Sequence, residues 1–426
     1  MRLPNELSYL RRFFALALTS LALSTAAWAQ VSGRLLHTFK GPEGSGPSAT
    51  LISDAAGNLY GTTNTGGRYG VGTVFQISPT SGYHLLHSFQ GTDGSGPVFA
   101  PLMLDAIGNL FGTTRYDSER GCGTVFELTP APGGKWTFSL VHSFQGQSDG
   151  CMSEGGLVYD AAGNLYGTAQ YGGTYGQGLV FEFTPGPHGQ WSETMLYSFS
   201  GGPDGRNPVA GLLWDEAGNL YGTTSSGPPT HPCGNVFELS PPSVPGGTWT
   251  ELVLHSFDDI FDGCNPEAPL VFDAAGNLYG TTVGGRTAGY SYGTVFEVSP
   301  GPSGWTENLL YSFQAGDDGR WPYSTPVWDS AGNLYGTTFA GGGGPCNGYG
   351  CGTIFKLSAD GNGQWTETVL ARPVHGKHGA QPLGGLLADT RGNLYGTACT
   401  GGAHGMGTVF EITSHAAGVS RNALAP

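Results

Sequence analysis

Residues 105–113 read DAIGNLFGT, which is one of seven copies of the phrase D-x-x-G-N-L-(Y/F)-G-T. The first residues of the copies are spaced 51 to 60 apart, at Asp54, Asp105, Asp160, Asp215, Asp273, Asp329 and Asp389. A period of this length indicates a repeat architecture, which has to be considered before separate domains. Glycine and proline are frequent, at 75 and 28 of 426 residues, but this period and an aromatic content of 12% argue against disorder.

Each copy continues with four short segments that have the composition of strands. In the second copy these are PLMLD at 101–105, NLFGTT at 109–114, GTVFELT at 123–129 and WTFSLVHSF at 136–144. They are rich in β-branched and aromatic residues, and turn residues separate them. Four antiparallel strands per repeat form one propeller blade, whereas a β-solenoid rung needs only about 20–30 residues. The sequence therefore predicts an all-β fold, a seven-bladed β-propeller with four antiparallel strands per blade.

The two ends of the repeat array indicate how the ring closes. The last copy stops after its third segment, GTVFEI at 407–412, and lacks the L-L-H-S-F segment that ends the other copies. That segment occurs instead before the first copy, as LLHTF at 35–39. We therefore expect the N-terminal strand to complete the last blade, which removes the open sheet edges.

The first 29 residues have the pattern of a cleaved signal peptide. Arg2, Arg11 and Arg12 precede an apolar run, and Ala27-Trp28-Ala29 fits a small-x-small cleavage site. The apolar run is short for a membrane anchor, which needs about 20 residues. We expect residues 30–413 to form the propeller and 414–426 a disordered tail. The mature chain should be secreted, extracellular or periplasmic, and a monomer without membrane insertion.

The charge balance argues against one class of partner. The formal net charge is −15, and loss of residues 1–29 leaves 14 basic against 31 acidic side chains. Such an acidic surface repels nucleic acid and anionic lipid. We expect no nucleic-acid partner.

Residues that recur in every copy are interpreted first as structural, because a catalytic residue is needed once and a packing residue in every blade. The Asp and Asn of D-x-x-G-N suit a tight turn. The Trp of W-T-E should pack between blades, at Trp136, Trp191, Trp249, Trp305 and Trp365, with Tyr83 in the first copy. His87, His142 and His255 share a slot with Tyr197 and Tyr311, which indicates an aromatic ring with a polar tip. We expect no metal and no cofactor.

Six of the seven cysteines are predicted to form disulfides. Cys122 and Cys151 occupy the same two slots, before the third strand and in the following linker, as Cys233 and Cys264 two copies later. Because these loops lie on one face of a propeller, each pair should be adjacent, and export permits oxidation. Cys346 and Cys351 flank a short Gly-rich loop and form the third predicted pair. Cys399 remains unpaired.

The period D-x-x-G-N-L-Y-G-T-T…G-G…G-T-V-F-E-L resembles the bacterial GloVer tandem-repeat family, over nearly the whole chain after residue 29. Its D-x-x-G-N-L-Y element is also similar to NHL-type and two-component-regulator propeller repeats. The resemblance implies a secreted β-propeller and carries over no catalytic residue.

A binding function is predicted to lie on the loops that differ most between copies. Aromatic rings beside charged and amide groups suit sugars or peptides. The predicted ligand-binding residues are Tyr69, Tyr116, Tyr171, Tyr175, Tyr290, Tyr292, Trp321 and Tyr349. The alternative interpretation is that these rings only anchor Gly-rich loops. The leading hypothesis is a non-catalytic protein that binds a glycan or protein ligand or acts as a surface scaffold.

The second hypothesis is a carbohydrate-active hydrolase or lyase that uses Glu154 and Glu267. Both glutamates lie three residues before an inner strand, in slots held elsewhere by Ser48, Phe99, Val209, Ser324 and Leu383. Two carboxylates near a channel mouth would suit acid/base work. They belong to non-adjacent repeats, and the sequence places no His or Arg beside them. No serine elbow, zinc motif or phosphate loop occurs.

Overall fold

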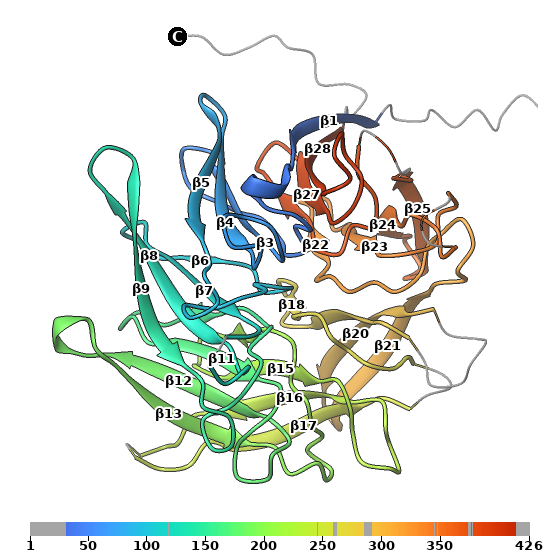
Figure 1. Ribbon diagram of the computed structural model, residues 1–426. Helices are drawn as coiled ribbons and strands as arrows, with labels where there is room; N and C mark the ends of the chain where they lie inside the picture. The colour runs from blue at the N-terminus through green and yellow to red at the C-terminus, as the bar shows by residue number, and fades with distance from the viewer. Residues whose placement is uncertain are drawn as a thin grey trace, which may run out of the picture.

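The computed structural model describes residues 31–414 except 118, 245, 259–261, 285–291, 345, 347, 374–375 and 377. The predicted signal peptide, the predicted tail after residue 414 and Tyr290 lie outside the described residues. The described chain forms seven four-stranded antiparallel sheets arranged around a centre, as Figure 1 shows. The predicted fold class is therefore confirmed.

Each sheet contributes an inner, a second, a third and a fourth strand. The inner strands are β2 Ile52–Ser53, β6 Met103–Leu104, β10 Val158–Tyr159, β14 Leu213–Trp214, β18 Val271–Phe272, β22 Val327–Trp328 and β26 Leu387–Ala388. The second strands are β3 Leu59–Thr63, β7 Leu110–Thr114, β11 Leu165–Ala169, β15 Leu220–Thr224, β19 Leu278–Thr282, β23 Leu334–Thr338 and β27 Leu394–Ala398.

The third and fourth strands are longer and form the outer half of each blade. The third strands are β4 Thr73–Ser78, β8 Thr124–Ala131, β12 Leu179–Pro185, β16 Asn235–Ser240, β20 Thr294–Gly301, β24 Thr353–Ala359 and β28 Thr408–Ser414. The fourth strands are β5 Gly82–Ser88, β9 Lys135–Ser143, β13 Trp191–Ser198, β17 Thr250–Ser256, β21 Gly304–Ser312, β25 Trp365–Ala371 and β1 Val31–Thr38. Two short 3-10 helices, η1 Gly41–Glu43 and η2 Pro187–Gly189, lie in connections.

The seventh blade combines the two ends of the described chain. Its sheet has the order β1-β28-β27-β26, and Leu35 of β1 pairs with Phe410 of β28. Figure 1 shows β1 beside β28, so the blue and red ends of the colour scale meet in one sheet. The predicted closure by the N-terminal strand is confirmed.

The inner strands are shorter than the sequence suggested. PLMLD predicts a five-residue strand, but only Met103 and Leu104 pair with β7. The segments before the inner strands instead approach one another: a methyl group on Gly211 would clash with the carbonyl oxygen of Gly155, in the preceding blade. Near the channel, the segments before the inner strands therefore pack against one another and do not continue the sheets.

In six of the seven blades, a buried threonine of the second strand forms a hydrogen bond to the linker of the next blade. Thr168 Oγ1 donates to the carbonyl oxygen of Ala210 in the next blade at 2.8 Å, and Thr397 donates to Ala49 at 3.2 Å across the closure. Six blades make this bond, and Thr113 Oγ1 of the second blade has no hydrogen-bond partner within the described chain. These bonds join neighbouring blades around the ring.

The D-x-x-G-N turns have the predicted structural role. In the first copy, Asp54 Oδ1 accepts the backbone N–H groups of Ala56 and Asn58, both at 2.9 Å. Its Oδ2 accepts the Asn58 amide and the Tyr60 hydroxyl. The carboxylate is therefore occupied by its own turn.

The inter-blade packing of the Trp residues is also confirmed, with one correction. Trp136 meets Tyr60 of the preceding blade edge-on at 6.1 Å, and Trp191 meets Phe111 at 6.0 Å. Tyr83 does not occupy the Trp slot. It pairs with Ile77 of the third strand, and in the third blade the equivalent position, Phe183, pairs with Glu193. Tyr83 therefore occupies the slot of the Glu in W-T-E. The hairpin before Tyr83 is shorter, which shifts the alignment by two residues.

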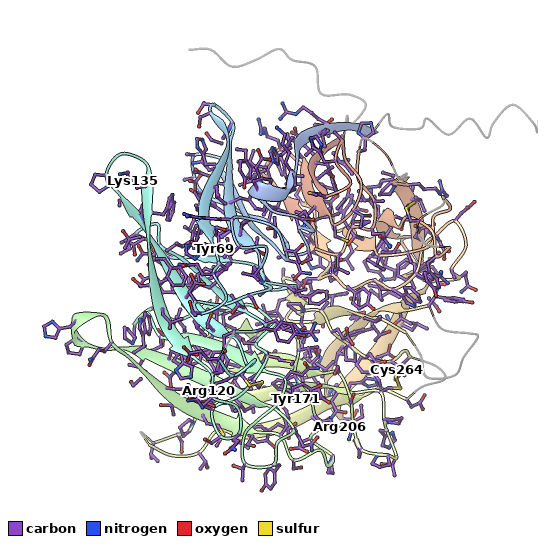
Figure 2. All side chains as sticks on the ribbon, viewed as in Figure 1. Tyr69, Arg120, Lys135, Tyr171, Arg206 and Cys264 are labelled. Atoms are coloured by element: carbon purple, nitrogen blue, oxygen red, sulfur yellow. A yellow bond between two sulfur atoms is a disulfide. The ribbon has the colours of Figure 1, made fainter. Side chains whose placement is uncertain are left out.

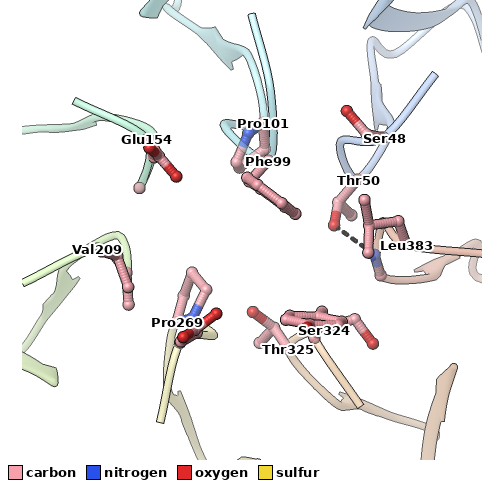
Figure 3. Close-up of a pocket in the computed structure, with 16 residues that line it drawn as sticks. Ser48, Thr50, Phe99, Pro101, Glu154, Val209, Pro269, Ser324, Thr325 and Leu383 are labelled. Carbon is pink, nitrogen blue, oxygen red and sulfur yellow. Dashed lines mark hydrogen bonds between the residues drawn. The ribbon is translucent and has the colours of Figure 1, made fainter. Parts of the chain in front are cut away.

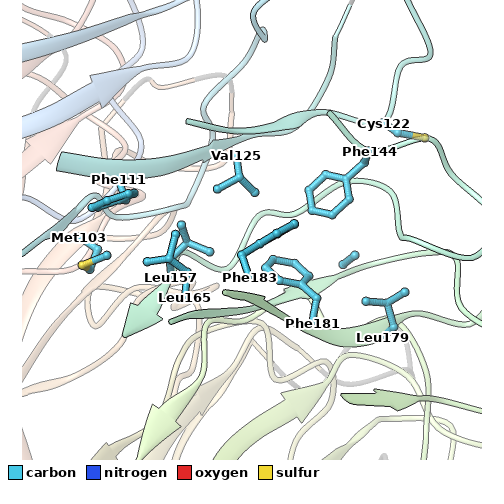
Figure 4. Close-up of a cluster of buried hydrophobic side chains, with 11 residues drawn as sticks. Met103, Phe111, Cys122, Val125, Phe144, Leu157, Leu165, Leu179, Phe181 and Phe183 are labelled. Atoms are coloured by element: carbon cyan, nitrogen blue, oxygen red, sulfur yellow. The ribbon is translucent and has the colours of Figure 1, made fainter. Parts of the chain in front are cut away.

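The hydrophobic core lies between blades as well as within them. Figure 4 shows one cluster in which Met103, Phe111 and Phe144 of the second blade pack against Leu165 and Phe181 of the third. Gly167 has a local reason to be glycine, since a methyl group there would lie 2.5 Å from Cζ of Phe181, its cross-strand partner.

The loops predicted to share one face are joined by their backbones. In each blade the linker before the inner strand forms a bridge with the loop after the second strand, as Cys151 does with Tyr171. The disulfides Cys122–Cys151, Cys233–Cys264 and Cys346–Cys351 are present as predicted, and Cys399 is free. The blade register is therefore confirmed independently of the strands.

Candidate functional site

The channel mouth brings together seven residues, one from each linker. Ser48, Phe99, Glu154, Val209, Glu267, Ser324 and Leu383 line one hollow (Figure 3). Its volume is about 40 Å³, and one water needs roughly 10–15 Å³ measured in this way. The hollow therefore admits a few water molecules but not a sugar ring.

Glu154 has a basic partner, contrary to the expectation from the sequence. Arg115, in the loop after β7, places Nε 2.7 Å from Glu154 Oε1, although the N–H does not point at the oxygen. Glu154 is 7% exposed. Burial raises its pKa, and the Arg115 cation partly offsets that effect. The pair was not predictable from the repeat, because arginine occurs at the position of Arg115 in one copy only.

Glu267 lies in a different electrostatic environment. Burial, and then the negative charge of Glu154, raise the pKa of Glu267 to about 7. Tyr323 is affected in turn, since burial and the charge of Glu267 raise its pKa to about 12. Two carboxyl groups with different proton affinities suit acid/base chemistry. The size of the hollow, however, leaves no room for a polymer between them.

Three of the predicted ligand residues meet around one arginine. The Arg320 guanidinium lies 4.5 Å from the ring centre of Trp321, 5.1 Å from that of Tyr349 and 5.9 Å from that of Tyr292. The Trp321 and Tyr349 rings are 5.6 Å apart, and Tyr349 is 54% exposed. We name Tyr292, Arg320, Trp321 and Tyr349 the Arg320 platform.

The backbone of the Arg320 platform is held on both sides. The Trp321 N–H donates to the Tyr292 carbonyl at 2.7 Å, and the Trp321 carbonyl accepts a hydrogen bond from the Phe339 N–H at 3.0 Å. The Arg320 side chain donates to the Tyr349 carbonyl at 3.0 Å. The rings therefore project from fixed backbone.

Trp321 occupies a position that favours a different residue type. Its φ is 59°, in the left-handed region, and the same slot is left-handed in every linker. The residues there are Gly46, Gly96, Met152, Asn207, Asn265, Trp321 and Gln381. Glycine and asparagine tolerate this conformation, whereas a bulky residue is strained by roughly 1–3 kcal/mol, and such strain clusters at functional sites.

The other four predicted ligand residues within the described chain are exposed but separate. Tyr69 lies beside Arg68 and Tyr116 beside Arg115, with 5.3 and 5.2 Å between guanidinium and ring centre. Tyr171 and Tyr175 lie on one loop of the third blade. Figure 2 shows Tyr69 and Tyr171 on different blades, well apart. No described contact joins these rings to the Arg320 platform.

The family comparison agrees with the repeat. A family model described as the Gloeobacter/Verrucomicrobia repeat matches residues 24–237, 133–306 and 212–423. The chain belongs to this repeat family. No curated protein sequence shows significant similarity to it.

Solved structures similar to this Gloeobacter/Verrucomicrobia repeat protein have a low sequence identity to it. The extracellular domain of a hybrid two-component system from B. thetaiotaomicron has a TM-score of 0.54 and 8% identity. The match covers 89% of this chain but only 39% of that chain. A protein described as a 6-phosphogluconolactonase from Bacteroides uniformis ATCC 8492 has a TM-score of 0.49 and 14% identity, over 78% and 85% of the two chains. At 8% identity, the match to the two-component system shows a shared fold and nothing more.

The Gloeobacter/Verrucomicrobia repeat is interrupted at one seam, between the sixth and seventh blades. The fourth strands elsewhere end in His or Tyr followed two residues later by Phe, but here Ala371 and Pro373 occupy those slots. Gly33 of β1 replaces the Glu of W-T-E. A cavity of about 280 Å³ lies at this seam, against Ala371, Pro373 and Gly33. The cavity was not predicted, although the absence of three large side chains at these slots is visible in the sequence.

Proposed function

We propose that the protein is an exported, non-catalytic propeller that binds a neutral glycan on the Arg320 platform. The observation that carries the proposal is Trp321, a large, half-buried ring in a slot where four of the six other linkers have Gly or Asn. A strained aromatic residue that the fold does not require indicates a function for its side chain.

The chemistry of the platform suits a sugar. The faces of Trp and Tyr rings pack against apolar C–H surfaces, and the tips of these side chains form hydrogen bonds. Arg320 supplies N–H donors, which sugar hydroxyl groups accept. The net charge of −15 repels polyanions, so the proposal is for a neutral glycan rather than an acidic one.

Export is part of the proposal. The three disulfides are consistent with an oxidising compartment. Within the described residues, no helix has the length and apolar character needed to cross a bilayer. We propose that residues 1–29 are a cleaved signal peptide and that the remaining chain acts as a monomer outside the cytoplasm. The propeller then comprises residues 30–414, one residue more than expected from the sequence because Ser414 pairs with Val31, and residues 415–426 form a tail.

A glycan array probed with the chain lacking residues 1–29 tests the proposal. The decisive variant is Trp321→Asn, since Asn207 and Asn265 already occupy this slot in other blades. It should keep or raise the melting temperature while glycan binding is lost, and Tyr349→Ala should weaken binding. Unchanged glycan binding by Trp321→Asn, or binding to protein ligands only, would refute the proposal.

Glu267 supports a second candidate function. Its pKa is raised to about 7, and the neighbouring carboxyl group, Glu154, is paired with Arg115. Two carboxyl groups with different proton affinities would suit a carbohydrate-active hydrolase or lyase. In the structure as it stands, the hollow of about 40 Å³ between them does not admit a sugar ring, so this function would need a wider channel mouth. Turnover of any polysaccharide in a panel, with loss of activity in Glu267→Gln, would replace the binding proposal.

A further inference from the structure

Four blade interfaces repeat one arrangement of three polar side chains. The fourth strand of a blade supplies His or Tyr, the linker that follows supplies Asp, and the W-T-E segment of the next blade supplies Glu. Two interfaces use histidine, namely His142, Asp149 and Glu193, and His255, Asp262 and Glu307. Two use tyrosine, namely Tyr197, Asp204 and Glu251, and Tyr311, Asp318 and Glu367. The histidine interfaces differ from the others by offering an imidazole nitrogen beside two carboxylates.

The donor atoms of each histidine cluster lie close enough to share an ion. In both clusters one ligand atom from each residue lies within 4.8 Å of the other two. His255 Nε2 is 2.8 Å from Asp262 Oδ2, and His142 Nε2 is 3.3 Å from Asp149 Oδ2 and 3.5 Å from Glu193 Oε2. Donors around tetrahedral zinc are about 3.4 Å apart, given bond lengths of about 2.0–2.2 Å. Small side-chain rotations therefore suffice.

The clusters also contain buried acceptors without hydrogen-bond partners. Glu193 Oε1, Asp149 Oδ1 and Glu307 Oε1 are shielded from solvent and accept no hydrogen bond within the described chain. Unpaired buried acceptors of this kind are uncommon and costly. A cation between the three side chains would satisfy them.

Backbone amides hold the aspartates in place. The Gln145 N–H donates to Asp149 Oδ2 at 2.8 Å, and the Asp258 N–H donates to Asp262 Oδ1 at 2.9 Å. Such bonds orient a metal-binding carboxylate and restrict its rotation. The clusters therefore have partly organised ligands before any ion arrives.

We propose that His142–Asp149–Glu193 and His255–Asp262–Glu307 are two zinc sites, each holding Zn²⁺ between adjacent blades with water in the fourth position. One imidazole and two carboxylates suit Zn²⁺, whereas Ca²⁺ takes six to eight oxygen ligands and does not use imidazole. The proposal revises the interpretation of the His/Tyr slot, because the glutamate comes from the next repeat and the sequence pattern did not connect it to the histidine.

The chain contains its own negative controls. His87 contacts Asp93, but Phe138 stacks on the imidazole at 4.3 Å in the slot where the glutamate would lie. Tyr83 likewise stacks on His37 at 4.3 Å. These interfaces lack the third ligand, so the proposal predicts no zinc there.

Zinc titration calorimetry on the disulfide-bonded chain without residues 1–29, after treatment with EDTA, tests the proposal. Two Zn²⁺ ions should bind per chain. His142→Tyr and His255→Tyr should each remove one ion, since two other blades carry Tyr in this slot, and His87→Tyr should retain both. X-ray absorption of the unaltered zinc-loaded chain should show one imidazole per zinc. Absence of saturable binding, zinc stoichiometry unchanged by both substitutions, or zinc coordination by oxygen alone would overturn the proposal.

Discussion

Phe39→Ala measures how firmly the N-terminal strand closes the ring. Phe39 follows β1, is fully buried, and meets the Phe75 ring edge-on at 5.1 Å, in the next blade along the ring. Its N–H donates to the Gly407 carbonyl at 3.1 Å. Removing a buried Phe side chain costs about 3–5 kcal/mol when the surroundings do not collapse. We expect a loss of stability in this range.

Phe199→Ala is the matched control for this change. Phe199 is equally buried, donates to Gly178 at 3.0 Å and meets Phe237 at 5.2 Å, but no chain end lies in its blade. Urea unfolding of both variants, followed by tryptophan fluorescence with the disulfides intact, should give similar losses. If Phe199→Ala lowered the midpoint and Phe39→Ala left it unchanged, β1 would not hold the seventh blade, and the closure would be refuted.

Three further predictions follow from contacts between and within blades. Thr397→Val should lower the free energy of unfolding by about 1 kcal/mol, the net value of one hydrogen bond. Thr113→Val loses no hydrogen bond and should lower it by less. Equal urea midpoints for the two variants would contradict this. Burial, and then Asp204 for Glu251 and Asp318 for Glu367, raise the pKa of these glutamates from 4.5 to about 7. The folded chain therefore retains protons that the unfolded chain releases, so this stabilisation is complete below pH 4.5 and is lost as the pH rises through about 7. In EDTA, the double variant Glu251→Gln, Glu367→Gln should have a higher melting temperature than the unaltered chain at pH 8 but not at pH 4. If the melting temperatures of the two proteins differed by the same amount at both pH values, the raised pKa of these glutamates would be contradicted. Replacing Cys122 and Cys151 by Ala should lower the free energy of unfolding by about 3–4 kcal/mol, because the unfolded chain gains the entropy of a loop with a 29-residue separation. Replacing Cys346 and Cys351, with a separation of 5, should lower it by about 2 kcal/mol. Equal losses in urea unfolding would count against this entropic origin.

Features fixed by the repeat register were predictable from the sequence. Cys122 and Cys151 recur in the slots of Cys233 and Cys264, so one register places both disulfides. The displaced LLHTF segment likewise identified the strand that pairs with β28. Because each prediction needed only the order of strands in a blade, no side-chain detail was required.

Features that depend on single residues or on the next repeat were not predictable. Arg115 pairs with Glu154 from a loop position that holds no arginine in any other copy. Thr168 looked like an ordinary strand residue, since its partner is a backbone carbonyl 42 residues further along the chain. The aromatic residues of the loops were visible, but only the structure shows that Tyr292, Trp321 and Tyr349 meet at Arg320 whereas Tyr69 and Tyr175 do not.

Hydrogen–deuterium exchange with and without the strongest glycan from the array tests the central claim most directly. The account predicts slower exchange in the linker around Arg320 and Trp321 and in the loop that carries Tyr349, with no change near Glu154 and Glu267. Slower exchange confined to the channel mouth around these glutamates, with the Arg320 platform unaffected, would contradict it.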